Sequence, residues 1–154
     1  MESVTASPWI GRQTALAAIQ AYNDNSIADI MAVRAPNCIH EILPQSIPRP
    51  PMNNQEYEKY LDGTWHNFRN FHAEVIDIIE DRDKNKVVIH ARSTAETTVG
   101  KYANEYMLVF HLTWAGDKVV RFQEFVDSGA TVAFFGRLRK HIAENGNPQL
   151  APEA

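Results

Sequence analysis

The chain has 154 residues, of which 44% are apolar and 22% are charged, and its formal net charge is −4. A chain of this length fits one globular domain that buries roughly 70% of the surface its unfolded form exposes. It contains no run of basic residues and no patch that interleaves basic and aromatic residues, so nucleic acid is not an expected partner.

The N-terminal part of the chain predicts two helices. The opening sequence MESVTASPWIGRQ has neither the basic start nor the apolar centre of a secretory signal, so we expect a cytoplasmic protein with no membrane partner. Ser7 can act as an N-cap before Pro8. The apolar face of this helix then holds Ala15, Leu16, Ile19 and Tyr22. Ser26 can cap a second, short helix, and Pro36 should stop it.

A short strand and a proline-rich loop come next. Residues 38–43, CIHEIL, predict a strand that ends at Pro44, and the chain's only cysteine, Cys38, excludes an internal disulfide and a cysteine-built zinc site. The stretch HEILPQSIPRPPMNN holds four of the eight prolines. After it, Asn53 or Asn54 can cap a helix. The inner stripe of that helix is Tyr57, Tyr60, Leu61, Thr64, Trp65 and Phe68.

From Phe71 onward the hydrophobic period changes from helical to alternating. The alternation predicts four strands, at residues 72–80, 86–98, 104–114 and 118–127. Their connections are too short for crossovers, so the strands should be antiparallel. A closing helix is expected after Gly129, with an apolar face of Val132, Phe135, Leu138 and Ile142. Residues 1–143 therefore form one domain, and residues 144–154 form a loose tail.

This order of elements predicts an α+β fold. Three to four helices should pack on one side of a strongly curved antiparallel sheet, which gives the domain the shape of a cone. The natural place for a ligand is the space between the helices and the concave face of the sheet.

The stretch YANEYMLVFHLTWAGDKVVRFQEFVDSG, residues 102–129, resembles a known family pattern. It combines an Asn-Glu-Tyr strand, a turn centred on glycine, and a last strand ending Glu-x-x-Asp. The pattern and the element order are similar to the SnoaL-like polyketide cyclases of the nuclear-transport-factor-2-like superfamily. The stretch RAPNCIHEILPQSIPRPPMNNQEY further resembles small isomerases and cyclases of fungal polyketide and meroterpenoid pathways.

The resemblance implies a cofactor-free enzyme, commonly a homodimer, with an acid–base pocket inside the cone and a small polyketide-type substrate. It does not fix the reaction, because the same superfamily includes dehydratases, epoxide hydrolases, ketosteroid isomerases and proteins without chemistry. The reaction must therefore be inferred from the site.

Proton abstraction beside a carbonyl needs a base, a donor or cation for the enolate oxygen, and an apolar wall. In related cyclases a carboxylate at the place of Asp127 is the base, and Glu124 is a nearby alternative that would otherwise contact substrate or the surface. Strict alternation puts these two side chains on opposite faces, so only one can enter the cavity unless a bulge intervenes. Asp127 could instead cap the last helix.

Three of the six histidines are catalytic candidates. His72 alternates in phase with Ile76 and Ile78, which would place it at the mouth of the cone. His40 could project inward beside the proline loop. His90 lies in a polar row that faces either the cavity or solvent. The other three are expected to be surface or core residues. No His-x-His pair or His-Glu-x-x-His helix occurs, so no metal site is expected.

Arg49 lies between prolines that restrict its backbone, so its side chain should be held ready to bind an anion. The alternative is a loop that merely shapes a lid, with Arg49 paired to a surface acid. Four aromatic residues are candidate walls for a flat polycyclic substrate: Tyr57, Trp65, Tyr106 and Phe110.

These residues together favour an isomerase or cyclase that acts on a carbonyl-rich, polycyclic, polyketide-derived intermediate. In this hypothesis Asp127 or His72 removes a proton, Arg49 holds the enolate or phenolate, and His40 or His90 returns a proton elsewhere. The alternatives are a dehydratase with the same base and a dimeric ligand-binding module without chemistry.

Overall fold

The structure is a computed structural model that describes residues 9–148. The elements in this part of the chain are α1 (Ile10–Asn23), α2 (Ile27–Ala32), β1 (Arg34–Leu43), α3 (Asn54–Thr64), the 3₁₀ helix η1 (Trp65–Asn67), β2 (Phe68–Asp81), β3 (Lys86–Thr97), β4 (Gly100–Leu112), β5 (Val119–Val126) and α4 (Ser128–Asn145). The predicted cap formed by Ser7 and Pro8 lies outside the described residues.

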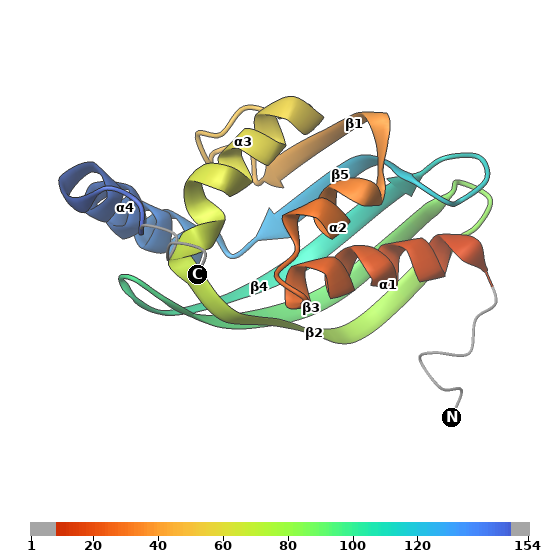
Figure 1. Cartoon of the computed structure of the whole chain (residues 1–154). Helices are drawn as coiled ribbons and strands as arrows, with labels where there is room; N and C mark the ends of the chain where they lie inside the picture. The colour runs from red at the N-terminus through yellow and green to blue at the C-terminus, as the bar shows by residue number, and fades with distance from the viewer. Residues whose placement is uncertain (1–8, 149–154) are drawn as a thin grey trace.

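The five strands form one sheet in the order β1-β5-β4-β3-β2. The four predicted strands pair as an antiparallel meander, as expected. β1, however, runs parallel to β5, so the expectation of an entirely antiparallel sheet is wrong at this edge (Figure 1). The direction of β1 could not be predicted, because a short turn fixes the relative direction of two strands only when they are consecutive in the chain, and β1 and β5 are not.

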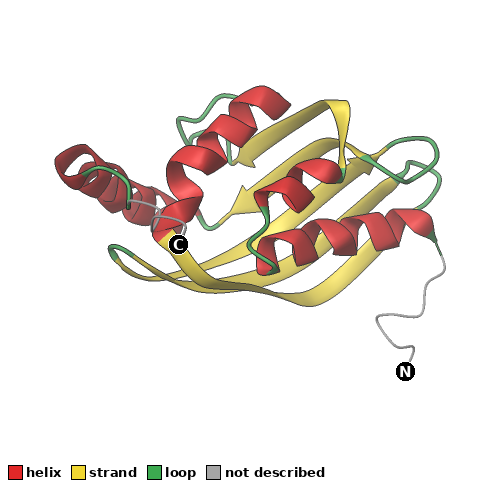
Figure 2. Ribbon diagram, viewed as in Figure 1, coloured by secondary structure: helices red, strands yellow, loops and turns green. Residues whose placement is uncertain are grey.

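Helices α1, α2 and α3 lie over the concave side of the sheet, as predicted, and α4 lies beyond one end of the sheet (Figures 1 and 2). One group of buried residues joins α1 to the sheet and includes Ala15, Ile89 and Phe110. A second group joins α3 to α4 and includes Leu61 and Phe134. Within residues 9–148, no helix is both long enough and apolar enough to cross a membrane.

Two of the predicted helix starts are confirmed by their caps. The Ser26 side chain accepts a hydrogen bond from the Asp29 amide at the start of α2. Asn53 accepts from the Glu56 amide, and the Glu56 side chain accepts from the Asn53 amide, which completes a capping box at the start of α3. α3 therefore begins where its sequence satisfies the first free amides.

Two predicted helix ends differ from the structure. α2 ends at Ala32, and Pro36 lies in β1, where the pairing with β5 shifts register. Proline is tolerated at such an irregularity because it has no amide hydrogen to donate. α3 ends at Thr64 instead of continuing to Phe68, which begins β2 and stacks on Trp65 at 5.3 Å between ring centroids.

The last helix, α4, begins two residues earlier and ends later than predicted. Asp127 is its N-cap, and the carboxylate oxygen Oδ1 accepts a hydrogen bond from the Ala130 amide at 3.1 Å. The helix continues to Asn145, so its last two residues belong to the predicted tail. The division of the chain into a domain and a tail stays a prediction.

Candidate active site

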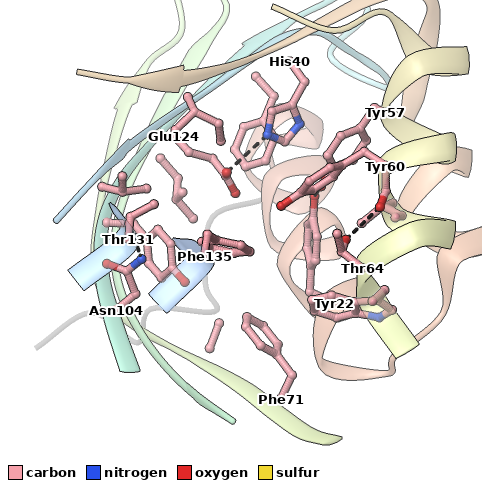
Figure 3. A pocket seen from close by; sticks show the side chains of 18 of the residues that line it. Tyr22, His40, Tyr57, Tyr60, Thr64, Phe71, Asn104, Glu124, Thr131 and Phe135 are labelled. Carbon is pink, nitrogen blue, oxygen red and sulfur yellow. Dashed lines mark hydrogen bonds and ion pairs between the residues drawn. The ribbon is translucent and has the colours of Figure 1, made fainter. Parts of the chain in front are cut away.

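The main pocket lies between α1, α3 and α4 on one side and the concave face of the sheet on the other (Figure 3). Its walls are mostly aromatic and aliphatic, and its cavity volume is about 100 Å³. The polar side chains that line it are Tyr22, His40, Arg49, Tyr57, Tyr60, Thr64, Tyr102, Asn104, Tyr106, Glu124 and Thr131. The place of the cavity agrees with the prediction from the fold.

The strongest acid–base pair in this pocket is formed by His40 and Glu124. β1 and β5 lie side by side, and this pairing sets His40 beside Phe122 and Ile42 beside Glu124, so the two polar side chains meet on the inner face. His40 Nε2 lies 3.2 Å from Glu124 Oε2. The His40 side chain is 0% exposed and that of Glu124 is 20% exposed, and Figure 3 shows the carboxylate directed into the cavity.

The His40 imidazole is neutral in this environment. Burial lowers the pKa of His40 below its usual range; Glu124 opposes this shift, and Arg34 and Arg49 add to it. The ring stacks on Tyr57 with 4.0 Å between centroids and meets Phe122 edge-on at 4.8 Å. The rings hold the imidazole in a single orientation against the pocket.

Arg49, predicted at the lip, does line the pocket. Its Nη1 donates a hydrogen bond to the Tyr60 hydroxyl at 3.0 Å, and the guanidinium lies 4.6 Å from the Tyr60 ring centroid and 5.2 Å from that of Phe135. Cation–π contacts of this kind favour a fixed position for the guanidinium. The charge is therefore held beside the cavity by α3 and α4.

Three of the four predicted wall residues line the pocket: Tyr57, Trp65 and Tyr106. The fourth, Phe110, does not. It is buried in the core behind the pocket and stacks on Phe122 with 4.5 Å between centroids. Phe110 shares the inward face of β4 with Tyr106, but α1 covers that end of the sheet, so this part of the face is filled by core residues.

Several predicted residues lie outside the pocket. Asp127 is exposed and caps α4, which confirms the alternative that it serves as a helix cap. His72 is exposed and shares the outer face of β2 with Ile76, whereas Phe71 and Ala73 face the cavity. The pairing of β2 with β3 shifts register between Val75 and Asp77, so the inward side chain of Ile78 is no longer in phase with His72. His90 lies on the outer face of the sheet, where its Nε2 is 2.7 Å from Glu105 Oε2.

Six of the eleven polar residues that line the cavity were not among the predicted site residues: Tyr22, Tyr60, Thr64, Tyr102, Asn104 and Thr131. The Tyr22 and Tyr57 hydroxyls are 2.5 Å apart. The Asn104 amide donates to the Thr131 hydroxyl at 2.8 Å and to the Tyr102 hydroxyl at 2.9 Å. Alternation along β4 places Tyr102 and Asn104 on the same face as Tyr106, so these two could have been found once Tyr106 was selected.

The buried tyrosines are neutral hydrogen-bonding groups. Burial raises the pKa of Tyr57 and of Tyr106 well above the usual range. It raises the pKa of Tyr22 and of Tyr102 to about 12. In the part of the chain that the structure describes, no group of three or more His, Cys, Asp or Glu side chains is arranged to hold a metal ion.

The fold is a small α+β domain with a curved sheet and a pocket on its concave face, the fold of the nuclear-transport-factor-2-like class. One solved structure of similar shape is named an NTF2-like protein (TM-score 0.68), and another is described as having a ketosteroid isomerase-like fold (TM-score 0.65). A family model described as SnoaL-like domain matches residues 15–122. The match covers well over half of the chain, so the protein belongs to the SnoaL-like domain family.

Two curated relatives and one solved structure illustrate the neighbours. Core atranone cluster protein 11 of Stachybotrys chlorohalonatus is 30% identical over 128 residues, covering 83% of this chain and 96% of that protein. Monooxygenase AacuO of Aspergillus aculeatus is 30% identical over 106 residues, covering 69% of this chain and 66% of that protein. BvnE pinacolase from Penicillium brevicompactum matches with a TM-score of 0.80 at 27% identity, over 85% of this chain and 95% of that one.

The buried neutral His40 predicts a pH dependence of stability. A histidine whose pKa is lower in the folded than in the unfolded protein adds stability that is complete above about pH 6.5, the usual histidine value. That stability is lost as the pH falls below this value. Unfolding by urea between pH 8 and 5 should show a smaller loss in His40→Gln than in the wild type. The exposed His66 offers a matched control, His66→Gln, and equal losses in all three proteins would contradict the prediction.

Proposed function

We propose that the protein is a cofactor-independent isomerase or cyclase of secondary metabolism that acts on a carbonyl-rich, polycyclic, polyketide-derived intermediate. The observation that carries this proposal is the Glu124 carboxylate beside the neutral His40 imidazole, 3.2 Å away, inside a pocket walled by aromatic rings. A carboxylate in such surroundings is suited to remove a proton from carbon next to a carbonyl group. Flat apolar walls suit a fused-ring substrate.

In the proposed reaction the base that removes the proton is Glu124, the alternative to Asp127, and neither Asp127 nor His72. The C–H bond breaks, the proton moves to a Glu124 oxygen, and the electron pair forms an enolate whose charge rests on the carbonyl oxygen. The Arg49 guanidinium at the pocket wall stabilises this negative charge. The proton then returns at another carbon, or the enolate carbon attacks a second carbonyl group, a carbon–carbon bond closes the ring, and the carbonyl oxygen, now an alkoxide, takes the proton from Glu124.

One of the neighbours supports a rearrangement without net oxidation. A pinacolase rearranges the carbon skeleton of an oxygenated substrate, and BvnE carries this name. The name of AacuO indicates oxygen insertion instead. The products separate these reactions: an isomerase gives a product of unchanged mass, a dehydratase one that has lost water, and a monooxygenase one that has gained an oxygen atom.

Glu124→Gln should abolish most turnover, by about 10² to 10⁴-fold, because glutamine cannot accept the proton. The measurement is chromatography with mass detection after incubation with a pool of pathway intermediates, following the mass-neutral shift in retention. Asp127→Asn is the matched control and should keep turnover, because asparagine caps helices as well as aspartate does. Full activity in Glu124→Gln, or its loss only in Asp127→Asn, would overturn the assignment of the base.

Arg49→Ala should reduce turnover by about 10- to 100-fold, because the developing enolate loses the nearest positive charge at the pocket wall. Arg49→Lys should restore part of this loss, since it returns the charge without the planar fork. Both variants are to be compared with Arg69→Ala, which changes an exposed arginine of β2. If Arg49→Ala turns over substrate as fast as Arg69→Ala does, Arg49 has no part in the reaction.

A homodimer, which the family resemblance implies, stays a proposal. The outer face of the sheet carries Phe125 and Met107, which are register partners and are 51% and 40% exposed. Glu105 and Arg121 lie on the same face, so this face carries charges of both signs, and two copies can meet without like-charge repulsion. Light scattering at micromolar concentration should give twice the monomer mass, and Phe125→Lys should give the monomer; a monomeric wild type would contradict the proposal.

A further inference from the structure

Arg34 is a buried charged residue directly behind the acid–base pair. It begins β1, and its side chain is sealed from the solvent. Its Nη2 lies 2.7 Å from His40 Nδ1, its Nη1 lies 3.7 Å from the Cys38 sulfur, and the guanidinium covers the Tyr57 ring at 4.1 Å from the centroid. Within residues 9–148, no carboxylate comes within ion-pair distance of this guanidinium.

The contact between Arg34 and His40 fixes where the imidazole carries its proton. A guanidinium has only N–H donors and no lone pair to offer, so His40 Nδ1 must accept the hydrogen bond. A neutral imidazole with an accepting Nδ1 carries its single hydrogen on Nε2. The arginine therefore selects one of the two tautomers of His40.

The hydrogen on Nε2 has no hydrogen-bond partner of good geometry. Nε2 is completely buried and lies at the pocket wall, and although Glu124 Oε2 is 3.2 Å away, the N–H is poorly aligned with that oxygen. A buried N–H without an acceptor is costly, by about 1–3 kcal/mol in general. Because Nε2 is out of reach from the pocket, the group that this hydrogen faces is the Glu124 carboxylate.

We propose that Arg34 is a positioning residue that holds His40 as the neutral tautomer whose Nε2–H faces the Glu124 carboxylate, so that the imidazole does not become a cation and Glu124 stays free to act as the base. This inference rests on the proposed function for the part played by Glu124. His40 then neither takes nor gives a proton in the first step: the substrate proton goes to Glu124, and the neighbouring Nε2–H holds that carboxylate in place.

The charged and titratable groups around His40 agree with this division of roles. Arg34 from β1 and Arg49 from the proline loop both disfavour a second proton on the ring, and only Glu124 from β5 favours one. Tyr57 from α3, which stacks on the imidazole, is neutral. Without Arg34, Nδ1 could bind a proton, and the resulting imidazolium would pair with Glu124 and occupy the base.

The direct test is nitrogen NMR of the wild-type protein labelled with ¹⁵N-histidine, with His40 assigned by comparison with His40→Gln. At pH 7 the His40 signals should show a protonated Nε2 and an unprotonated Nδ1, and His40 should titrate at a lower pH than the exposed histidines of the unfolded chain, whose usual value is about 6.5. A protonated Nδ1 at pH 7 in the wild type overturns the inference, and this result needs no folded Arg34 variant.

Arg34→Met extends the test to the role of the arginine. The His40 signals should then show mixed tautomers or a positive ring near pH 6, and kcat should fall by about 10- to 100-fold, the range seen when a residue that orients a site histidine is removed at metal centres. Arg34→Lys returns a donor and should restore part of both. Unchanged His40 signals in a folded Arg34→Met protein overturn the role of Arg34.

The outcomes separate this inference from the proposed function. If the wild-type signals show Nε2–H but Glu124→Gln keeps full turnover, the proposed reaction fails and the tautomer assignment stands. If Glu124→Gln is inactive but His40 carries its proton on Nδ1, the proposed reaction stands and the role of Arg34 fails.

Discussion

The interaction on which the site depends is the row formed by the Arg34 guanidinium, the His40 imidazole and the Glu124 carboxylate across the edge of the sheet. The arginine brings a positive charge into an apolar interior, where an isolated ion is very unfavourable. Here the neutral ring between the two charged groups accepts from one and faces the other, and the Tyr57 ring covers the guanidinium. The arrangement keeps both charges buried or half-buried without a direct ion pair that would neutralise the base.

The row exists only because β1 pairs with β5. His40 and Glu124 are 84 positions apart in sequence, and the parallel register brings them to neighbouring places on the inner face. The opposite wall of the cavity is built by α3 and α4, which supply Tyr60 and Phe135 to hold Arg49. The pocket is therefore lined by segments far apart in the sequence: β1 and α3 from the first half of the chain, and β5 and α4 from the second half.

The element order, the antiparallel meander and the caps at Ser26 and Asn53 could be predicted because each depends on local chemistry: alternation, short connections and side chains that satisfy free amides. The site was predicted less well. His40 and Arg49 were placed correctly beside the proline loop, but His72 was not, because an irregularity in strand pairing changed the face on which it lies. Arg34 was missed because a single arginine before a strand carries no sequence signal of its own.

The sequence by itself determined the α+β class with its curved sheet, and that only one of Glu124 and Asp127 can enter the cone, since alternation sends them to opposite faces. Only the tertiary structure decided which one does. Asp127 stands where β5 ends and satisfies the first amides of α4, whereas Glu124 stands one strand away from His40. Strand periodicity is a property of the local chain. Which face of β5 lines the cavity depends instead on the tertiary structure, because the strand that pairs with β5 at the edge of the sheet is β1, which is far away in the sequence.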